Sequence, residues 1–363
     1  MKEIDDLLSQ ILGQPHEHAG EGLDGAAWDG LVDSGLDRVG IAEANGGVGG
    51  ELADAVLVIA RCAEAGVSAP LTETLLVAGA CVGRAGLTLP DGRVSAVLPA
   101  ARPLLTRPVP GLRASWVPGG WRLSGSAPAV AWGNDADCLV APVSFADGGL
   151  AVAILARADY TASPGTNLAG EPRDTVHLDD RGVPADQVAS VAADALDDLV
   201  LRAALGRSAQ LLGSIRACLS LTIGYARLRE QFGRPISRQQ AVRHAVVEMV
   251  GEVAATEAAV TAAREQLDDA GGQRVIENSR LAVSIARVQA ARAATSVSAI
   301  AHQVHGAIGL THEYPLHHFT SRLWAWRDEY GSEHDWAVAL GAAARDQDDL
   351  WSALSSVPGP QIA

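Results

Sequence analysis

The chain has 363 residues, of which 48% are hydrophobic and 20% charged, and its formal net charge is −15. This length allows two or three domains with substantial cores. The acidic balance argues against a nucleic-acid or anionic-membrane partner, because both need clustered Lys and Arg. No apolar run reaches membrane-spanning length and the N-terminus does not resemble an export signal, so we expect a cytoplasmic protein.

The hydrophobic pattern divides the chain into three zones, which we interpret as domains. Residues 1–89 have helical apolar spacing, interrupted by a glycine-rich turn, and predict an N-terminal helical domain. Residues 90–193 are rich in Pro, Gly and short β-branched runs, which is typical of short strands between turns. Residues 194–363 return to long helical spacing and predict an antiparallel helical bundle. The predicted fold class is therefore mainly α with a central, barrel-like β-domain.

Near the end of a long helical pattern, a positive charge, an aromatic ring and a sharp turn follow one another. Arg229 precedes Phe232 by three positions, and Gly233 and Pro235 then stop the helix. A guanidinium binds phosphate oxygens through two parallel hydrogen bonds, and a phenyl ring can cover a ribose or an adenine. The segment indicates a site for an anionic cofactor, although a surface arginine beside a core phenylalanine fits the same spacing.

A second segment, one helical pair later, combines Gln303 with Gly306. The glutamine supplies an amide, and the glycine lets the backbone approach a ligand closely. A glycine at the end of a helix is a weak signal when it stands alone. The glycine is informative here because the segment that contains it comes after the Arg229 segment, so that the two motifs stand in a fixed order.

Taken together, the segments 229–236 and 303–316 resemble two signatures of the acyl-CoA dehydrogenase family, an R-x-x-F-G turn and a Q-x-x-G-G loop. In that family, both segments of one subunit hold the FAD of its neighbour. The resemblance covers nearly the whole chain, since helices, a β-domain and a bundle follow one another in the family's order. It implies the acyl-CoA dehydrogenase fold and an oxidoreductase acting on a CH–CH bond.

The resemblance assigns cofactor-binding roles to Arg229, Phe232, Gln303 and Gly306. Where the family usually has a second glycine in the Q-x-x-G-G loop, this chain has Ala307. The added methyl group puts the closeness of the backbone to the cofactor in doubt.

The middle zone departs from the family at the flavin-ring positions. The family's T-E-P-x-A-G-S-D falls on residues 99–106, which contain none of its residues. Its L-N-G-x-K-x-W-I-T motif aligns with residues 123–131, where the Lys, Trp and Thr positions are Ala127, Ala129 and Ala131. We therefore expect the fold to be retained and this chain's own flavin-ring pocket to be lost.

Trp132 lies close to the missing tryptophan but three positions later. In a strand, an odd offset directs a side chain to the opposite face. We therefore expect Trp132 not to replace the family's tryptophan.

Dehydrogenation of an acyl-CoA needs a carboxylate that removes the α-proton while hydride leaves for the flavin. Most of the family places this Glu just before a Gly-Thr, which Gly331-Ser332 resembles, so Tyr330 occupies the base position. A phenol ionises too weakly to serve well at neutral pH. Glu329 is the remaining candidate for the catalytic base, one residue earlier and rotated by about 100° if the segment is helical.

Some branches of the family place the base at the start of the first bundle helix. That position is Ala203 here, and the arginine that usually follows is Ala204. Both base positions of the family therefore lack a carboxylate in this chain.

Several histidines gather in the C-terminal part of the chain and raise the question of a metal site. No thiolate accompanies them, and the nearby carboxylates lack ligand spacing, so we expect no metal. These histidines are His302, His305, His312, His317, His318 and His334.

These observations favour one function and leave two alternatives. The favoured function is a non-catalytic subunit that completes the FAD site of a related subunit, in a heterotetramer that dehydrogenates an acyl-CoA. By resemblance to heteromeric family members, the substrate would be a steroid side-chain CoA thioester and the acceptor an electron-transferring flavoprotein. The alternatives are an autonomous homo-oligomeric dehydrogenase that uses Glu329 as its base, and a flavin-free scaffold subunit.

Overall fold

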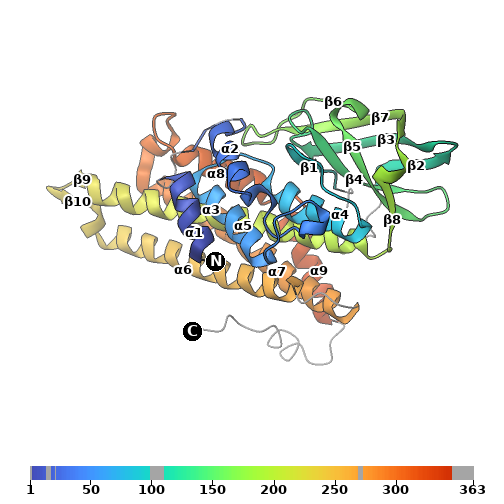
Figure 1. Cartoon of the computed structure of the whole chain (residues 1–363). Helices are drawn as coiled ribbons and strands as arrows, with labels where there is room; N and C mark the ends of the chain where they lie inside the picture. Colours follow the sequence, from blue (N-terminus) through green and yellow to red (C-terminus); the bar gives the residue numbers. More distant parts are fainter. Residues whose placement is uncertain (1, 14–17, 21, 99–109, 269–272, 346–363) are drawn as a thin grey trace. The chain divides into compact units, whose positions relative to one another are not determined.

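The computed structural model describes residues 2–13, 18–20, 22–98, 110–268 and 273–345 (Figure 1). This part of the chain forms two compact units, each gathered from segments that are far apart in the sequence. The first unit comprises Met1–Ala27, Val56–Ser68 and Arg207–Ala363, and the second comprises Trp28–Ala55 and Ala69–Gly206.

Long helices build the first unit. They pack mainly around α7, which contacts α6, α8 and α9 along its length. The helices are α1 (Lys2–Leu12), α3 (Leu52–Ala65, whose first turn is in the second unit), α5 (Ala195–Leu228, which begins in the second unit), α6 (Gln240–Asp268), α7 (Gln273–His305), α8 (Leu316–Trp326) and α9 (Glu333–Arg345), with the short η6 (Ile236–Arg238) and η7 (Gly306–Leu310).

One face of α6 is buried and the other is left open. The buried residues recur every three, four or seven positions, which is the spacing of one helical face; they are Met249, Thr256, Val260, Ala263 and Leu267. Val247 and Val250 lie on the exposed side of the same helix. The helix therefore has apolar residues on both sides, although the unit buries only one.

Close helix packing explains Gly213 on α5. A Cβ atom at this position would lie 2.1 Å from the carbonyl oxygen of Ala60 and 2.8 Å from the Cβ of Ala63, both on α3. Only glycine lets the two helix backbones approach to this distance.

The second unit is built on one sheet with the strand order β6-β7-β3-β2-β4-β5-β8, and β1 pairs with β4 beside this path. Neighbouring strands are antiparallel except that β1 and β2 run parallel to β4. The strands are β1 (Val94–Ala96), β2 (Leu112–Val117), β3 (Gly120–Ala131), β4 (Cys138–Ser144), β5 (Leu150–Ala156), β6 (Thr161–Ser163), β7 (Arg173–Val183) and β8 (Val188–Val191).

Short helices accompany the sheet in the second unit. They include a π-helical segment, Thr72–Ala78, that runs directly into α4 (Gly79–Ala85). The others are α2 (Gly25–Asp33, which begins in the first unit), η1 (Leu36–Arg38), η2 (Glu43–Asn45), η4 (Arg157–Asp159) and η5 (Ala185–Gln187).

The sheet encloses its own core. Buried aliphatic side chains from five strands pack together, among them Leu112, Leu123, Leu139, Leu155 and Val176. Strands β2, β3 and β7 also carry exposed residues, as expected for a sheet with one buried face, whereas β4 and β5 are buried over most of their length.

The order of elements confirms the predicted class, a mainly α protein with a central β-domain. The domain boundaries expected after residues 89 and 193 stay predictions. Within the described ranges, no helix is both long and apolar enough to cross a bilayer.

Candidate functional site

The predicted cofactor-binding turn is a tight hairpin between α5 and α6, at the far end of both helices in Figure 1. Its strands are β9 (Glu230–Gln231) and β10 (Arg234–Pro235), joined by Phe232 and Gly233. These two residues have φ angles of 54° and 73°, which is the geometry of a type I′ turn. The backbone N–H of Ile236 donates to the carbonyl of Arg229 at 2.8 Å and closes the hairpin.

The side chains of this hairpin point into solvent. Phe232 is 92% exposed and Leu228, one residue before Arg229, is 84% exposed. Arg229 is exposed as well. The exposed phenyl ring adds little to the stability of this chain, and the left-handed backbone conformation of Phe232 costs stability. The hairpin therefore has the character of a surface that contacts another molecule.

The second predicted segment lies where α7 ends and η7 begins. Gln303 and Gly306 are both exposed. Gly306 has φ of 65°, and a Cβ atom there would meet nothing within 4 Å. The backbone conformation, rather than lack of space, therefore favours glycine at this position. Ala307 is also exposed.

An aromatic contact brings the two segments together. The ring of Tyr225, one helical turn before Arg229, stacks on the ring of His305 with centroids 4.6 Å apart. The Nδ1 atom of His305 lies 2.7 Å from the carbonyl oxygen of Ala301, and its Nε2 lies 3.2 Å from the hydroxyl of Tyr314. Burial lowers the pKa of His305. The end of α7, which leads to Gln303 and Gly306, thus packs against the part of α5 that leads into the hairpin with Arg229 and Phe232.

The loop that resembles the family's base loop lies between α8 and α9, and a buried arginine holds it. The Nη2 atom of Arg287, on α7, lies within hydrogen-bond distance of four backbone carbonyls of this loop. The distances are 2.7 Å to Trp326, 2.9 Å to Arg327, 2.6 Å to Glu329 and 3.2 Å to Gly331. Burial, followed by the charge of Arg207, lowers the pKa of Arg287 to about 9.

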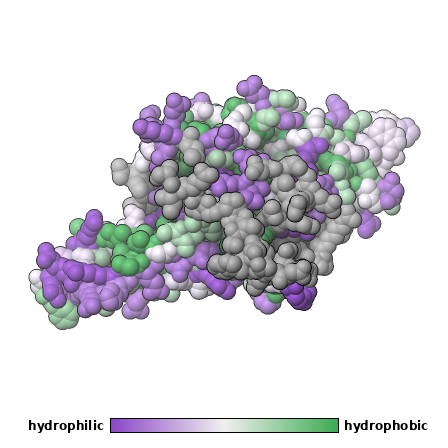
Figure 2. Space-filling model, turned by 90° about the horizontal axis from the view of Figure 1, so that it is seen from below, coloured by the Kyte–Doolittle hydropathy of each residue, from purple (hydrophilic) through white to green (hydrophobic). Residues whose placement is uncertain are grey.

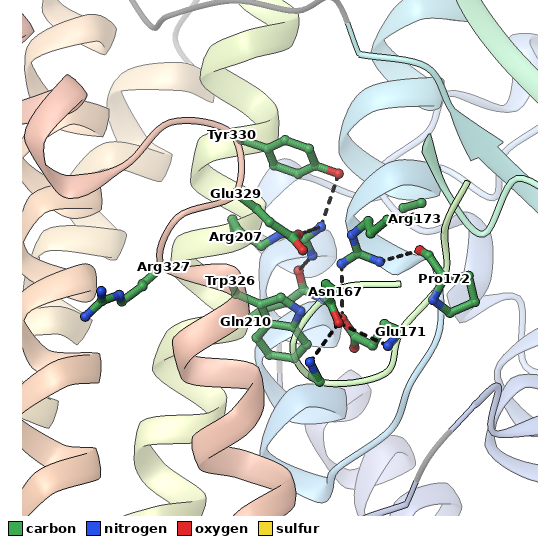
Figure 3. Close-up of polar contacts among 12 residues, drawn as sticks. Asn167, Glu171, Pro172, Arg173, Arg207, Gln210, Trp326, Arg327, Glu329 and Tyr330 are labelled. Carbon is green, nitrogen blue, oxygen red and sulfur yellow. Dashed lines mark hydrogen bonds and ion pairs between the residues drawn. The ribbon is translucent and has the colours of Figure 1, made fainter. Parts of the chain in front are cut away.

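The carboxylate of Glu329 is engaged by a second buried arginine (Figure 3). The Nη2 atom of Arg207, a residue that is 1% exposed, lies 2.8 Å from Oε2 of Glu329 and donates to the hydroxyl of Tyr330 at 3.1 Å. Arg207 Nη1 donates to Gln210, and the guanidinium carbon lies 4.6 Å from the centre of the Tyr330 ring. Ion pairing stabilises the charged carboxylate and therefore opposes the proton uptake that a base requires.

Tyr330 occupies the family's base position in an uncommon backbone conformation, with φ of 56°. The other two base-related positions, Ala203 and Ala204 on α5, are fully buried methyl groups. Both base positions therefore lack a carboxylate, and Glu329, the residue before Tyr330, is ion-paired.

The flavin-ring positions of the second unit carry small side chains, and the strand there is irregular. Ala127 and Ala131 are buried, whereas Ala129 is exposed with φ of 55°. The pairing of β3 with β7 shifts register between Ala127 and Val130. Residues 99–106, where the T-E-P motif was sought, lie outside the described residues.

Trp132 follows the end of β3, has φ of 58° and is buried. Strand alternation predicts the direction of a side chain only where a regular strand continues to that residue. Because a bulge and the strand end come first, alternation does not decide the direction of this side chain.

A cavity of about 850 Å³ opens in the second unit beside β2 and the β4–β5 hairpin. One arginine, three serines and an aromatic ring contribute to its lining, which suits a ligand with both anionic and apolar parts. These residues are Arg113, Ser115, Ser124, Ser144 and Phe145. In the part of the chain that the structure describes, no three His, Cys, Asp or Glu side chains are placed to hold a metal ion.

Comparison with known families identifies the bundle. Residues 199–327 match the family model described as acyl-CoA dehydrogenase, C-terminal domain. The bundle of this chain is therefore an acyl-CoA dehydrogenase C-terminal domain. The relatives support an oxidoreductase of the type that acts on the CH–CH bond of acyl-CoA, and acyl-CoA dehydrogenases bind FAD.

Individual acyl-CoA dehydrogenases resemble nearly the whole chain. FadE27 of Mycobacterium tuberculosis is 28% identical over 335 residues, which cover 87% of this chain and 88% of that protein. The ChsE4–ChsE5 complex from Mycobacterium tuberculosis includes a chain of similar fold, with a TM-score of 0.80, 21% identity and 96% of both chains covered. The Tcur3481–Tcur3483 steroid ACAD (G363A variant) gives a TM-score of 0.79, with 23% identity and 95% and 97% of the chains covered. These matches confirm the predicted acyl-CoA dehydrogenase fold.

The sequence reasoning missed the two arginines that organise the base loop. Each is a charged residue inside an apolar helical stretch, Arg207 after Ala203-Ala-Leu-Gly and Arg287 between Ala286 and Val288. A charge in such a place needs a buried partner. The sequence therefore indicates that each arginine has a buried partner, but it does not indicate which residue that partner is.

Proposed function

We propose that this chain is the partner-dependent subunit of a heteromeric, FAD-dependent acyl-CoA dehydrogenase. In this proposal its Arg229, Phe232, Gln303 and Gly306 complete the FAD site of a catalytic subunit. The observation that carries the proposal is the exposure of all four residues at one end of the first unit. A cofactor held only by this chain would be expected to bury part of this set against the chain itself.

These four residues suit the polar end of FAD. The guanidinium of Arg229 matches a phosphate group, and the exposed ring of Phe232 provides a face for a ribose or an adenine. The amide of Gln303 can donate and accept hydrogen bonds, and Gly306 leaves the backbone approachable. The FAD supplies hydride acceptance in the reaction, and the residues of this chain bind and orient its nucleotide part.

The state of this chain's own reaction centre supports the same proposal. Alanines stand at the three flavin-ring positions, and Glu329, the carboxylate next to the base position, is paired with Arg207. A catalytic partner with the family's ring and base residues would then perform proton removal from the α-carbon. The assembly expected from such pairing is a heterotetramer, with an electron-transferring flavoprotein as acceptor.

The substrate we propose is a CoA thioester with a bulky polycyclic acyl group, such as a steroid side chain. One similar structure is named a steroid ACAD, and another is a complex of two different chains. Two unlike subunits leave half of the reaction centres without catalytic residues, which frees room for a large acyl group.

The position of Glu329 keeps a second function open, an autonomous homo-oligomeric dehydrogenase with Glu329 as base. Its side chain is 17% exposed and lies in the loop that carries the base in most of the family. This function requires release from Arg207 during the reaction. A flavin-free scaffold subunit is the third alternative.

The visible spectrum of the purified chain separates these functions. We expect no flavin absorbance from the chain alone, and stoichiometric FAD after co-expression with a related chain that has intact T-E-P and W-I-T motifs. Stoichiometric flavin on the chain alone would instead establish the autonomous enzyme. A protein that carries no flavin, either alone or with a related chain, would support the flavin-free scaffold subunit.

A further inference from the structure

The hairpin that presents Arg229 belongs to a larger basic surface, which we call the basic arm and define as residues 227–243. It comprises the end of α5, the β9–β10 hairpin, η6 and the first residues of α6. The arm contains five arginines and one glutamate, a net charge of +4, in a chain whose net charge is −15. The rest of the chain therefore carries −19. The arginines are Arg227, Arg229, Arg234, Arg238 and Arg243.

All five arginines of the arm are exposed. Among the described residues, none of them lies within ion-pair distance of a carboxylate, and their one side-chain hydrogen bond runs from Arg243 Nε to the carbonyl of Ser237 at 3.1 Å. Elsewhere in the same unit, arginines that reach the surface are paired, as the half-buried Arg216 is with Glu257 at 2.7 Å and the exposed Arg292 with Glu333 at 2.9 Å. The arm is thus a concentrated positive surface that the unit does not neutralise.

FAD alone cannot account for this charge. Its pyrophosphate carries one negative charge on each of two phosphates, as other phosphodiester groups do. Arg229 and one neighbour would neutralise both. Three arginines then remain, and an interface that left them without anions would lose the charge-assisted hydrogen bonds that arginine forms with carboxylates.

Exposed apolar side chains accompany the charges. Leu228 and Phe232 stand on the arm, and Val247 and Val250 follow on the open side of α6. Figure 2 shows a green, apolar patch beside the purple, hydrophilic surface on the left. Apolar side chains among arginines are typical of the centre and rim of a protein–protein interface.

We propose that the basic arm docks into an acidic groove on a related, flavin-holding acyl-CoA dehydrogenase subunit. Carboxylates of that groove would neutralise the arginines that the FAD pyrophosphate leaves free. A second copy of this chain fits the charge, since its remainder is acidic, but its flavin-ring positions are Ala127, Ala129 and Ala131. On a second copy, the arm would therefore meet no site that holds a flavin ring. A related subunit with intact flavin-ring positions is the partner that we propose.

This inference rests on the proposed role as a partner-dependent subunit and adds the chemistry by which the partner is recognised. Opposite charges on two proteins raise the rate of encounter, and salt screens this effect over roughly 10 Å at 0.1 M. Association of the two subunits is therefore electrostatically steered, and it slows as ionic strength rises.

The experiment measures the association rate of this chain with the co-expressed related chain, at several salt concentrations, after separation and remixing. The test variant is Arg234→Gln, Arg238→Gln and Arg243→Gln together, which leaves Arg229 available for flavin. The matched control is Arg122→Gln, Arg181→Gln and Arg292→Gln, three exposed arginines that are ion-paired elsewhere. Both variants change the net charge equally.

At low salt we expect the arm variant to associate about tenfold more slowly than the natural chain, and the control to change by less than about twofold. The rate of the arm variant should also depend less on salt. Since the three arginines are exposed and unpaired, the thermal unfolding midpoint should not change, and the single variant Arg234→Gln repeats the test if the triple variant misfolds.

Equal slowing of arm and control variants would overturn the inference, because net charge rather than the arm would then set the rate. An unchanged rate for the arm variant would overturn it as well, while FAD in the assembled complex would leave the proposed function standing. Failure of the two chains to associate at any salt would instead defeat the proposed function. Self-association of this chain that the arm variant abolishes would make a second copy the occupant and overturn our choice of partner.

Discussion

Two groups of arginines in the first unit are used in opposite ways. At the base loop, Arg207 and Arg287 are buried and contact the loop through the carboxylate of Glu329 and four backbone carbonyls. In the basic arm, five arginines are exposed and without carboxylate partners among the described residues. Buried, paired charges mainly hold a backbone in place, whereas exposed, unpaired charges are available to another molecule. Arginine therefore has two roles in this unit. The buried arginines hold the base loop in place, and the exposed arginines of the basic arm are available to bind another molecule.

The largest effect is expected where an arginine is buried. Replacing Arg207 by alanine leaves Glu329 and Tyr330 without their cationic partner, so we expect the free energy of unfolding to fall by about 3 kcal/mol. Urea denaturation of the purified chain measures this change. The matched control is Arg292→Ala, which removes an exposed arginine paired with Glu333 and should cost at most about 0.5 kcal/mol. Equal losses for both variants would remove the distinction between the two kinds of arginine.

The activity of the assembled complex tests the other side of the Arg207–Glu329 pair. Glu329→Gln should lower the stability of this chain but leave kcat of the co-expressed complex within about twofold, because a missing general base would cost about 100-fold or more. A loss of that larger size would assign the base to Glu329. It would also show that the ion pair opens during the reaction.

The next largest effect is expected at Arg229, one of the exposed arginines of the basic arm. Arg229→Ala should weaken FAD retention by the complex about tenfold, or about 1.4 kcal/mol, through loss of a charge-assisted hydrogen bond to phosphate. The stability of this chain alone should not change, since Arg229 is exposed. Arg229→Lys should give an intermediate loss, because lysine keeps the charge without the paired donors. Fluorescence of released flavin after gel filtration measures the retention, and unchanged retention in Arg229→Ala would count against the interface role.

A smaller effect is expected at the junction between α7 and η7. Gly306→Ala forces a Cβ atom onto a residue with φ of 65° and should cost about 1 kcal/mol of stability. Gly224 on α5 is the control, because it is helical and a Cβ there would meet nothing within 4 Å. Gly224→Ala should stabilise the chain by about 0.5–1 kcal/mol. Thermal unfolding of the two variants should therefore move in opposite directions.

The smallest effect is a pH dependence at the contact between α5 and α7. Burial lowers the pKa of His305 from its ordinary value of 6.5, so the folded chain binds this proton less readily than the unfolded chain. The stability linked to His305 is then fully present above pH 6.5 and is lost as the pH falls through the lowered pKa. The His305→Gln variant should lose part of the decline in unfolding midpoint that the natural chain shows on acidification. Parallel curves for the two proteins would contradict this assignment.

Much of this organisation was readable from the sequence. Periodic apolar residues predicted the helices, and Gly233 and Pro235 predicted the end of α5. Arg229 and Gln303 are exposed, and their role in holding a cofactor stays a prediction. Local patterns succeed here because Gly233 and Pro235 end a helix by their own chemistry.

The base loop was not readable in the same way. Its geometry depends on Arg207 and Arg287, which lie more than a hundred and about forty residues before Glu329, and no local spacing encodes such a partner. The regular-strand assumption at Trp132 failed for a related reason, because the bulge in β3 follows from pairing with β7. Long-range contacts of this kind become visible only when the chain is folded.

At the turn formed by Phe232 and Gly233, the residue that would be most stable differs from the residue that would serve the proposed function. A two-residue turn with both φ angles positive is most stable as Asn-Gly, and a phenylalanine is poorly suited to its first position. Phe232→Asn should therefore give a firmer hairpin and, at the same time, a subunit that lacks its aromatic face. A sequence optimised for stability alone would replace this phenylalanine, which is consistent with a contact that the ring makes outside the chain.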